Sequence, residues 1–180
     1  MNDPLSIKKY IRTIKDFPIE GIKFRDITSL IETPIAFIKT CKEFKERAMK
    51  FNATLITSIE SRGFIFAGPV ACELSIPFVL ARKPGKLPNE TYKREFNLEY
   101  GSTSIEIQKN TKINVDDRVV IIDDLIATGG TAMACANILN EKFNVKKKNI
   151  LILCVIGLPD LGGSEIIRAH GYNVETLADY

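Results

Sequence analysis

Residues 119–132, VVIIDDLIATGGTA, combine groups suited to opposite charges. Asp123 and Asp124 are adjacent carboxylates at the end of an apolar run. A loop of small residues follows them: Ala127, Thr128, Gly129, Gly130 and Thr131. Because such a loop before a helix leaves backbone N–H groups free, it can bind a phosphate, and the threonine hydroxyls add donors. The acids would repel that phosphate unless they bind another part of the same ligand.

Burial of two adjacent acids is costly unless donors or a cation pair with them. Vicinal sugar hydroxyls donate to carboxylates, each charge-assisted bond contributing roughly 1.5–3 kcal/mol, and Mg²⁺ commonly accompanies substrate phosphates. A phosphorylated ribose would therefore suit both halves of the motif. The two common phosphate-loop motifs are absent, because Gly85-Lys86 is followed by Leu87 and no G-x-G-x-x-G follows a predicted strand. A glycine-rich turn with an N-cap threonine is the alternative for the loop alone.

The run VVIIDDLIATGGT resembles the binding signature for phosphoribosyl diphosphate (PRPP) in the type I phosphoribosyltransferases. Further segments, between Asp16 and Gly163, narrow the resemblance to the adenine phosphoribosyltransferases: DFPIEGIKFRDIT, ESRGF, RKPGKLP, LEYG and LPDLGG. The family's fold is an α/β domain with a parallel sheet flanked by helices on both faces, a small hood and a flexible lid loop. The resemblance implies that residues 1–180 form a single domain, whose N-terminal part contributes to the hood over the base site.

The same resemblance implies the reversible, Mg²⁺-dependent reaction of adenine with PRPP, which gives AMP and pyrophosphate in purine salvage. The ribose carbon becomes oxocarbenium-like as pyrophosphate leaves, and nearby carboxylates stabilise that positive charge. By resemblance, Asp123 and Asp124 are catalytic and hold the ribose hydroxyls, whereas residues 127–131 hold the 5′-phosphate. Mg²⁺ would be bound mainly by substrate phosphates and ribose, without a dedicated protein cage.

Two other segments are expected to bind the pyrophosphate. In ESRG the resemblance assigns this role to Ser61 and Arg62, and a planar guanidinium matches phosphate oxygens. The polar stretch 82–100 supplies the other candidates: Arg82, Lys83, Lys86 and Tyr100. Arg82 is also a candidate for a neighbouring subunit's site. The alternatives are a surface arginine before a helix and a solvated loop, although a loop of this length is often a lid.

Glu99, in LEYG, is favoured for general acid–base catalysis at a purine nitrogen. By resemblance, Phe24 and Leu158 sandwich the flat base, and the main chain around Lys23 and Arg25 contacts the edge with the exocyclic amine. A backbone acceptor for that amine and a donor to the ring nitrogen would favour adenine over a 6-oxopurine. An ordinary core aromatic is the alternative for Phe24.

The chain departs from many members of that family on either side of Leu158. Gly157 stands where they carry an acid, and Gly163 or Ser164 stands where they carry an arginine. A Gly-Gly form also occurs in the family. The base-binding wall is therefore matched less fully than the PRPP site.

The elements that must position these residues alternate along the chain. The predicted strands are apolar runs at 53–60, 77–81, 118–124 and 149–157, and the predicted helices cover 33–51, 63–74 and 131–143. Strands that are apolar throughout and separated by helices predict a parallel sheet covered on both faces. Ligands of such sheets bind outside the carboxyl ends of the strands. The segments ESRG, RKPGKLP, DDLIATGGT and GLPDLGG lie at those ends.

Composition limits the remaining choices. A chain of 180 residues that is 45% hydrophobic suits one globular domain, and a net charge of +3 is too mild to indicate a nucleic-acid partner. We find no secretory signal and no membrane-length apolar run, so a cytoplasmic protein without a membrane partner is expected. The four cysteines lack the close spacing of metal or redox sites, which favours reduced, structural thiols. A homodimer is expected from the family.

Three other functions compete with adenine phosphoribosyl transfer. A phosphoribosyltransferase for another purine base is disfavoured by IKFRDIT, but only moderately. A non-catalytic regulator that senses PRPP would carry a DNA-binding module, for which the segment before Asp16 is too short. A diphosphokinase that makes PRPP would need an ATP site and a longer chain.

Overall fold

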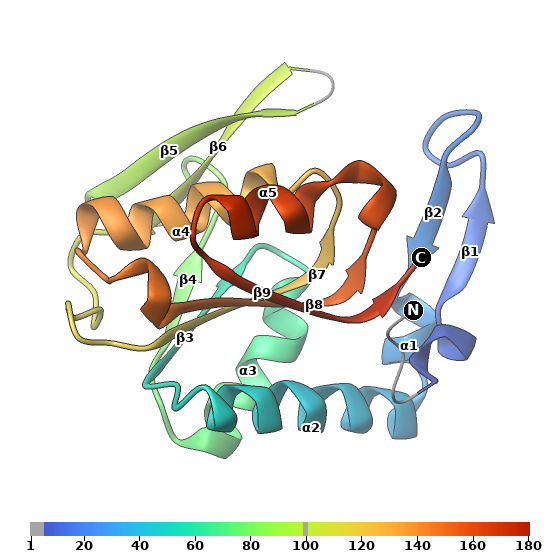
Figure 1. The fold of residues 1–180 in the computed structure, drawn as a ribbon, viewed down its shortest axis with the longest axis horizontal. Coiled ribbons are helices and arrows are strands. Elements are labelled where there is room, and N and C mark those ends of the chain that lie inside the picture. The colour runs from blue at the N-terminus through green and yellow to red at the C-terminus, as the bar shows by residue number, and fades with distance from the viewer. Residues whose placement is uncertain (1–5, 99–100) are drawn as a thin grey trace.

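A computed structural model describes residues 6–98 and 101–180 of the chain. Within these residues, a five-stranded parallel sheet forms the centre, in the strand order β4-β3-β7-β8-β9 (Figure 1). The strand bounds are β3 Leu55–Ile59, β4 Phe78–Ala81, β7 Val119–Ile126, β8 Ile150–Gly157 and β9 Asn173–Asp179. The predicted parallel sheet is confirmed. The sequence analysis missed β9, because this edge strand alternates polar with apolar residues and has no long apolar run.

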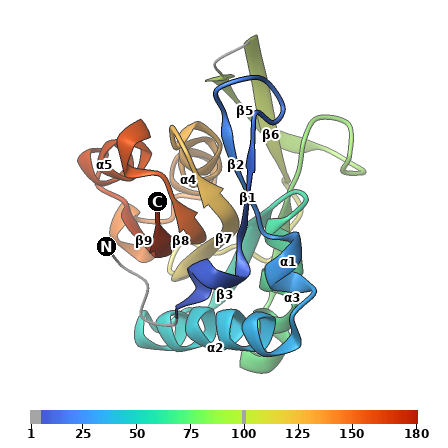
Figure 2. The same ribbon diagram turned by 90° about the vertical axis from the view of Figure 1, so that its right-hand side faces the viewer.

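Helices cover both faces of the sheet, as predicted (Figure 2). The first layer contains α2 Pro34–Lys50 and α3 Gly63–Leu74, and the opposite layer contains α4 Gly130–Lys142 and α5 Gly163–Ala169. Successive residues of β7 face different layers: Ile121 packs in the cluster with residues of α4, and Ile122 in the cluster with residues of α2 and α3. Burial on both sides explains why the central strands are apolar throughout.

Strand β7 continues past the two acids, which were expected to end it. Its pairing with β8 runs on to Ile126, opposite Gly157, and Asp123 lies opposite Cys154. The acids therefore belong to the strand itself. Hydrogen bonding in the sheet fixes their backbone.

The described part of the polar stretch, residues 82–98, does not form the long loop that its composition suggested. Strands β5 (Thr91–Leu98) and β6 (Gly101–Gln108) pair as an antiparallel hairpin. Tyr92 packs edge-on against Phe143, with ring centroids 5.2 Å apart, while the neighbouring Lys93 is exposed. This alternation suits a half-buried strand. The role of the segment as a flexible lid stays a prediction.

The N-terminal part forms a separate small unit beside the sheet (Figure 1, blue). It contains η1 Ile7–Tyr10, the antiparallel strands β1 Arg12–Lys15 and β2 Lys23–Asp26, and α1 Thr28–Ile31. The remaining short elements are η2 Lys147–Asn149 and η3 Pro159–Leu161. The division of the chain into a single domain with an N-terminal hood stays a prediction.

Gly63 allows α3 to begin against the centre of the sheet. A Cβ at Gly63 would lie 2.5 Å from Ser58 Oγ and 2.6 Å from Ile122 O, whereas a Cβ at Gly68 in the same helix would meet nothing within 4 Å. We expect Gly63→Ala to lower the free energy of unfolding by roughly 1–3 kcal/mol through overpacking. Gly68→Ala is the matched control and should raise it by about 0.5–1 kcal/mol. Urea unfolding measures both values, and equal changes would contradict the packing argument.

Candidate active site

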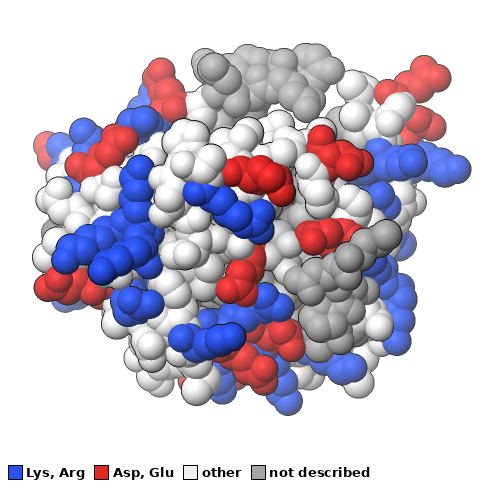
Figure 3. Space-filling model, in the orientation of Figure 1, with Lys and Arg blue, Asp and Glu red and all other residues white. Residues whose placement is uncertain are grey.

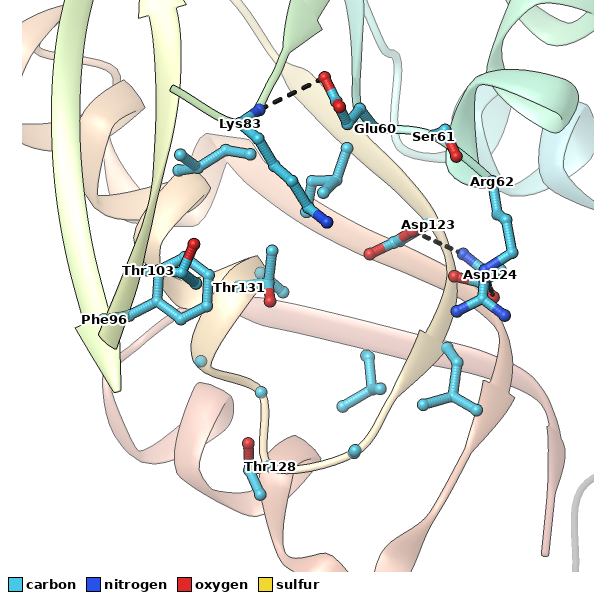
Figure 4. A pocket seen from close by; sticks show the side chains of 18 of the residues that line it. Glu60, Ser61, Arg62, Lys83, Phe96, Thr103, Asp123, Asp124, Thr128 and Thr131 are labelled. Atoms are coloured by element: carbon cyan, nitrogen blue, oxygen red, sulfur yellow. Dashed lines mark hydrogen bonds and ion pairs between the residues drawn. The ribbon is translucent and has the colours of Figure 1, made fainter. Parts of the chain in front are cut away.

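A cavity of about 340 Å³ opens at the carboxyl ends of β3 and β7 (Figure 4). Its lining comes from four places: residues 59–62 after β3, residues 123–132 of β7 and the following loop, Lys83, and residues 96 and 103–105 of the β5–β6 hairpin. Three of these places were predicted from the sequence, and the hairpin was not. The cavity brings both acids and the whole anion loop together.

Asp123 and Asp124 form the acidic floor of the cavity. The Asp124 side chain is only 7% exposed, and its Oδ2 lies 2.9 Å from Arg62 Nε. Burial raises the pKa of Asp123, and the neighbouring Asp124 charge raises it further. Burial also raises the pKa of Asp124, although Arg62 opposes this shift.

One oxygen of this pair lacks a donor. Asp123 Oδ1 accepts a hydrogen bond of 2.9 Å from the Asp124 backbone N–H. By contrast, no group in residues 6–98 and 101–180 makes a hydrogen bond to Asp124 Oδ2, because the close Arg62 Nε–H is not aligned for one. A buried carboxylate oxygen without a donor is costly, so this atom is suited to a ligand hydroxyl or a cation.

The loop after β7 has the geometry of an anion site at a helix N-terminus. Gly129 caps α4 with φ +81°, a conformation that glycine adopts without strain, and Gly130 is the first helical residue. The first N–H groups of a helix have no acceptor within it and can face a phosphate. Thr128 and Thr131 lie along the same loop (Figure 4).

Gly163 supports this loop from behind and was not predicted as a site residue. A Cβ at Gly163 would overlap Ala127 O and would lie 2.7 Å from Gly129 N. Any larger residue would therefore displace the loop. The Gly162-Gly163 pair after β8 is the sequence signal that marks such a close approach.

The predicted pyrophosphate residues divide into two groups. Ser61, Arg62 and Lys83 line the cavity, and the Lys83 side chain extends into it (Figure 4). Arg82 and Lys86 are not among the lining residues. Tyr100 and the predicted acid–base residue Glu99 lie outside the described residues.

The Arg82 side chain instead pairs with other residues of this chain. Its Nε lies 2.6 Å from Glu60 Oε2, and its Nη1 donates to Lys86 O at 3.0 Å. The peptide bond between Glu60 and Ser61 is cis. Glu60 lines the cavity as well, and the sequence analysis gave it no role.

Phe24 and Leu158 flank the cavity, although neither lines it. The Phe24 ring lies 5.7 Å from Arg62 Cζ and makes an edge contact with Phe17 at a centroid distance of 5.0 Å. The Leu158 N–H donates to Ile126 O at 3.0 Å. Phe24 and Leu158 therefore each contact a residue that lines the cavity, Arg62 and Ile126 respectively. The predicted base site between them would adjoin the part of the cavity that contains the acids.

The other two predicted base-site residues lie on β2, where Lys23 is exposed. Arg25 is partly buried, and its Cζ stacks 4.1 Å from the centroid of the Tyr180 ring. Their main-chain contacts with a base stay a prediction.

Phe96 and Thr103 also line the cavity from the β5–β6 hairpin, and the sequence analysis missed them (Figure 4). The sequence signal that could have found Phe96 is its spacing from Tyr92, because side chains four residues apart lie on the same side of a strand. Both pack against the core cluster that contains residues of α4.

Neither the surface charge nor the side chains of the described residues indicate a second binding site of their own kind, such as a charged face or a metal centre (Figure 3). On the face seen in Figure 3, acidic and basic side chains are intermixed. Within the described residues, no group of three or more His, Cys, Asp or Glu could hold a metal ion. Asp124 could supply at most one oxygen ligand to a cation that its substrate mainly holds, because Oδ2 already lies 2.9 Å from Arg62 Nε. In the described part of the chain, no helix is both long and apolar enough to span a membrane.

Comparisons with known proteins agree with this geometry. Residues 32–160 match the model of the phosphoribosyl transferase domain family. The adenine phosphoribosyltransferase of Pelagibacter ubique is 47% identical to this chain over 98% of both chains. The crystal structure of adenine phosphoribosyltransferase from Thermoanaerobacter pseudethanolicus superposes with a TM-score of 0.86 at 40% identity, covering 97% of this chain and 98% of that chain.

A second solved structure, the Giardia lamblia enzyme complexed with 9-deazaadenine, superposes with a TM-score of 0.89 at 36% identity and covers 97% of this chain and 96% of that one. The sequence comparisons and the structural comparisons indicate the same family. The relative and both solved structures each match almost the whole chain. This chain therefore belongs to the phosphoribosyltransferase family and, within it, to the adenine phosphoribosyltransferases.

Proposed function

We propose that the cavity at the ends of β3 and β7 transfers the 5-phosphoribosyl group of PRPP to adenine, releasing AMP and pyrophosphate. Membership of the adenine phosphoribosyltransferases makes the chain a pentosyltransferase of purine salvage. The observation that carries the assignment of the site is the meeting of two adjacent acids and the anion loop in one cavity, where Asp124 Oδ2 has an ion pair but no aligned hydrogen bond among the described residues. One phosphorylated ribose suits both.

In this proposal, Asp123 and Asp124 accept hydrogen bonds from the two ribose hydroxyls, and the loop of residues 127–131 binds the 5′-phosphate. The C1′–O bond breaks and its electron pair leaves with pyrophosphate, while a purine nitrogen forms the new bond to C1′ and loses its proton. The buried carboxylates stabilise the positive charge that develops on the sugar, because water does not screen them there.

Ser61, Arg62 and Lys83 would bind the leaving pyrophosphate. Mg²⁺, when bound by the substrate phosphates and ribose, supplies further neutralisation of that charge. The Arg62 guanidinium would have to serve two anions, since it already pairs with Asp124. Its exposed position on the cavity wall allows it to contact a phosphate as well.

The remaining assignments come from the sequence. We propose Glu99 for proton transfer at the base and Tyr100 as a further pyrophosphate contact. Lys86 would contribute only if residues 82–86 rearranged. Arg82 pairs with Glu60 and does not line the cavity itself, and we propose that it serves a neighbouring subunit's site in a homodimer.

For base recognition, Phe24 and Leu158 would enclose the purine, and the main chain near Lys23 and Arg25 would contact its amine edge. The position of Phe24 beside Arg62 supports this arrangement, because a base there would lie close to C1′ of a bound ribose. We propose a cytoplasmic location. The exposed free thiol of Cys72 supports it, because such thiols persist in a reducing compartment.

Base choice is tested by competition. We expect a mixture of adenine, hypoxanthine and guanine with PRPP and Mg²⁺ to give AMP alone, because the expected main-chain pattern suits an exocyclic amine. Mass spectrometry identifies the nucleotides formed. Chelation of Mg²⁺ should abolish product. Formation of IMP or GMP without AMP would overturn the adenine assignment.

The catalytic role of the acids is tested by Asp123→Asn combined with Asp124→Asn. We expect kcat to fall by at least about 10²-fold, since the charge that stabilises the transition state is removed while the side-chain shapes remain. Steady-state kinetics measures kcat, and circular dichroism checks that the fold survives. The control Asp116→Asn changes an exposed acid and should leave kcat unchanged. An active double variant would remove the acids from the mechanism.

The same double variant should be more stable than the wild type. Burial raises the folded-state pKa of both acids, so the folded protein binds protons more tightly than the unfolded chain. The resulting stability is present at low pH and is lost as pH rises above about 4 and through the folded-state pKa values. We therefore expect urea unfolding at pH 4–8 to give a flatter pH dependence in the double variant. A lower stability than wild type at pH 7 would contradict this account.

A further inference from the structure

Tyr180 contacts both segments that carry the proposed walls of the base site. It follows β9, and its backbone N–H donates to Gly157 O at 3.0 Å. Gly157 is the last residue of β8 and directly precedes Leu158. The backbone of Tyr180 therefore holds the strand end from which the Leu158 wall begins.

The ring of Tyr180 contacts β2, the strand that carries the Phe24 wall. Arg25 lies directly after Phe24 on β2, and its Cζ lies 4.1 Å from the centroid of the Tyr180 ring. Lys8 Nζ lies 4.9 Å from the same centroid, and the Tyr180 hydroxyl donates to Lys8 O at 3.4 Å. In Figure 1 this end of the chain reaches the lower end of β2. One residue thus contacts both the sheet and the N-terminal unit.

The β1–β2 hairpin needs such a contact. It has four residues in each strand, and all four of β1 are exposed. A two-stranded hairpin is marginally stable by itself. Arg25 Nη1 donates to Thr13 Oγ1 within the hairpin, whereas the buried Arg25 Nε has no hydrogen-bond partner among the described residues. The Tyr180 ring is the contact that this guanidinium makes outside the hairpin. Loss of the ring would therefore free the hairpin that carries Phe24.

We propose that Tyr180 is a positioning residue for adenine binding, which fixes the Phe24 wall relative to the Leu158 wall. The inference rests on the proposed adenine site. Tyr180 does not touch the reacting atoms in this account. It acts by ordering Phe24 before the base binds, so that the binding free energy is not spent on ordering the hairpin.

The test uses Tyr180→Leu, which removes the ring but keeps the backbone hydrogen bond to Gly157. We expect the KM for adenine to rise about three- to tenfold, in the range of a lost cation–π contact, with kcat and the KM for PRPP within about twofold of wild type. Tyr180→Phe keeps the ring and should leave the KM for adenine within about twofold of wild type.

Phe51→Leu is the matched control at the far end of α2. Arg118 Cζ stacks 4.4 Å from the Phe51 ring centroid, so this variant removes a similar contact away from the site. It should lower the thermal midpoint without changing the KM for adenine. An unchanged KM for adenine in Tyr180→Leu, or equal rises in both KM values, would overturn the proposal.

Hydrogen exchange of the unliganded protein tests the same contact without reference to activity. Amides of residues 12–26 should exchange faster in Tyr180→Leu than in wild type, Tyr180→Phe or Phe51→Leu, while those of residues 119–126 stay unchanged. Unchanged exchange in residues 12–26 would overturn the inference even in an active enzyme. Absence of AMP formation by the wild type would instead overturn the proposed function.

Discussion

Asp124 is buried and Asp123 is partly buried on the central strand β7, and this placement constrains the elements around them. Two adjacent carboxylates with raised pKa values oppose folding, so the apolar strands on either side must offset their cost. Arg62 compensates only in part, since it meets Asp124 without an aligned hydrogen bond. The carboxylates of the site therefore lack hydrogen-bond donors, which the hydroxyls of a bound sugar can supply. The arrangement lowers the stability of the unliganded protein and favours its activity, a common trade-off in enzymes.

Close backbone approach is the second requirement of the site. Gly63 lets α3 begin beside Ile122, and Gly163 lets α5 begin against the anion loop. Two helix N-termini are thereby held near the carboxyl ends of β3 and β7. Because side chains at these positions would separate the layers, the geometry of the cavity depends on residues that have no functional groups of their own.

The walls beyond the sheet come from two hairpins of different origin. The β5–β6 hairpin adds Phe96 and Thr103 to the cavity, and the β1–β2 hairpin carries Phe24 beside Arg62. Neither hairpin belongs to the parallel sheet. Backbone hydrogen bonds between Arg82, directly after β4, and Glu106 of β6 join the β5–β6 hairpin to the end of the sheet. The contacts of Tyr180 with Arg25 and Gly157 therefore link the β1–β2 hairpin to the central sheet.

The sequence by itself determined the parallel sheet, its two helical layers and the meeting of both acids with the anion loop. These follow from local pattern: apolar runs mark buried strands, and segments at strand ends must converge at one edge of a parallel sheet. Only the tertiary structure decided that β7 continues through the acids, that Arg82 pairs with Glu60, and that residues 91–98 pair with residues 101–108. Those outcomes depend on partners distant in the sequence, and a single chain's local pattern does not specify which distant groups will satisfy a charge or an exposed strand edge.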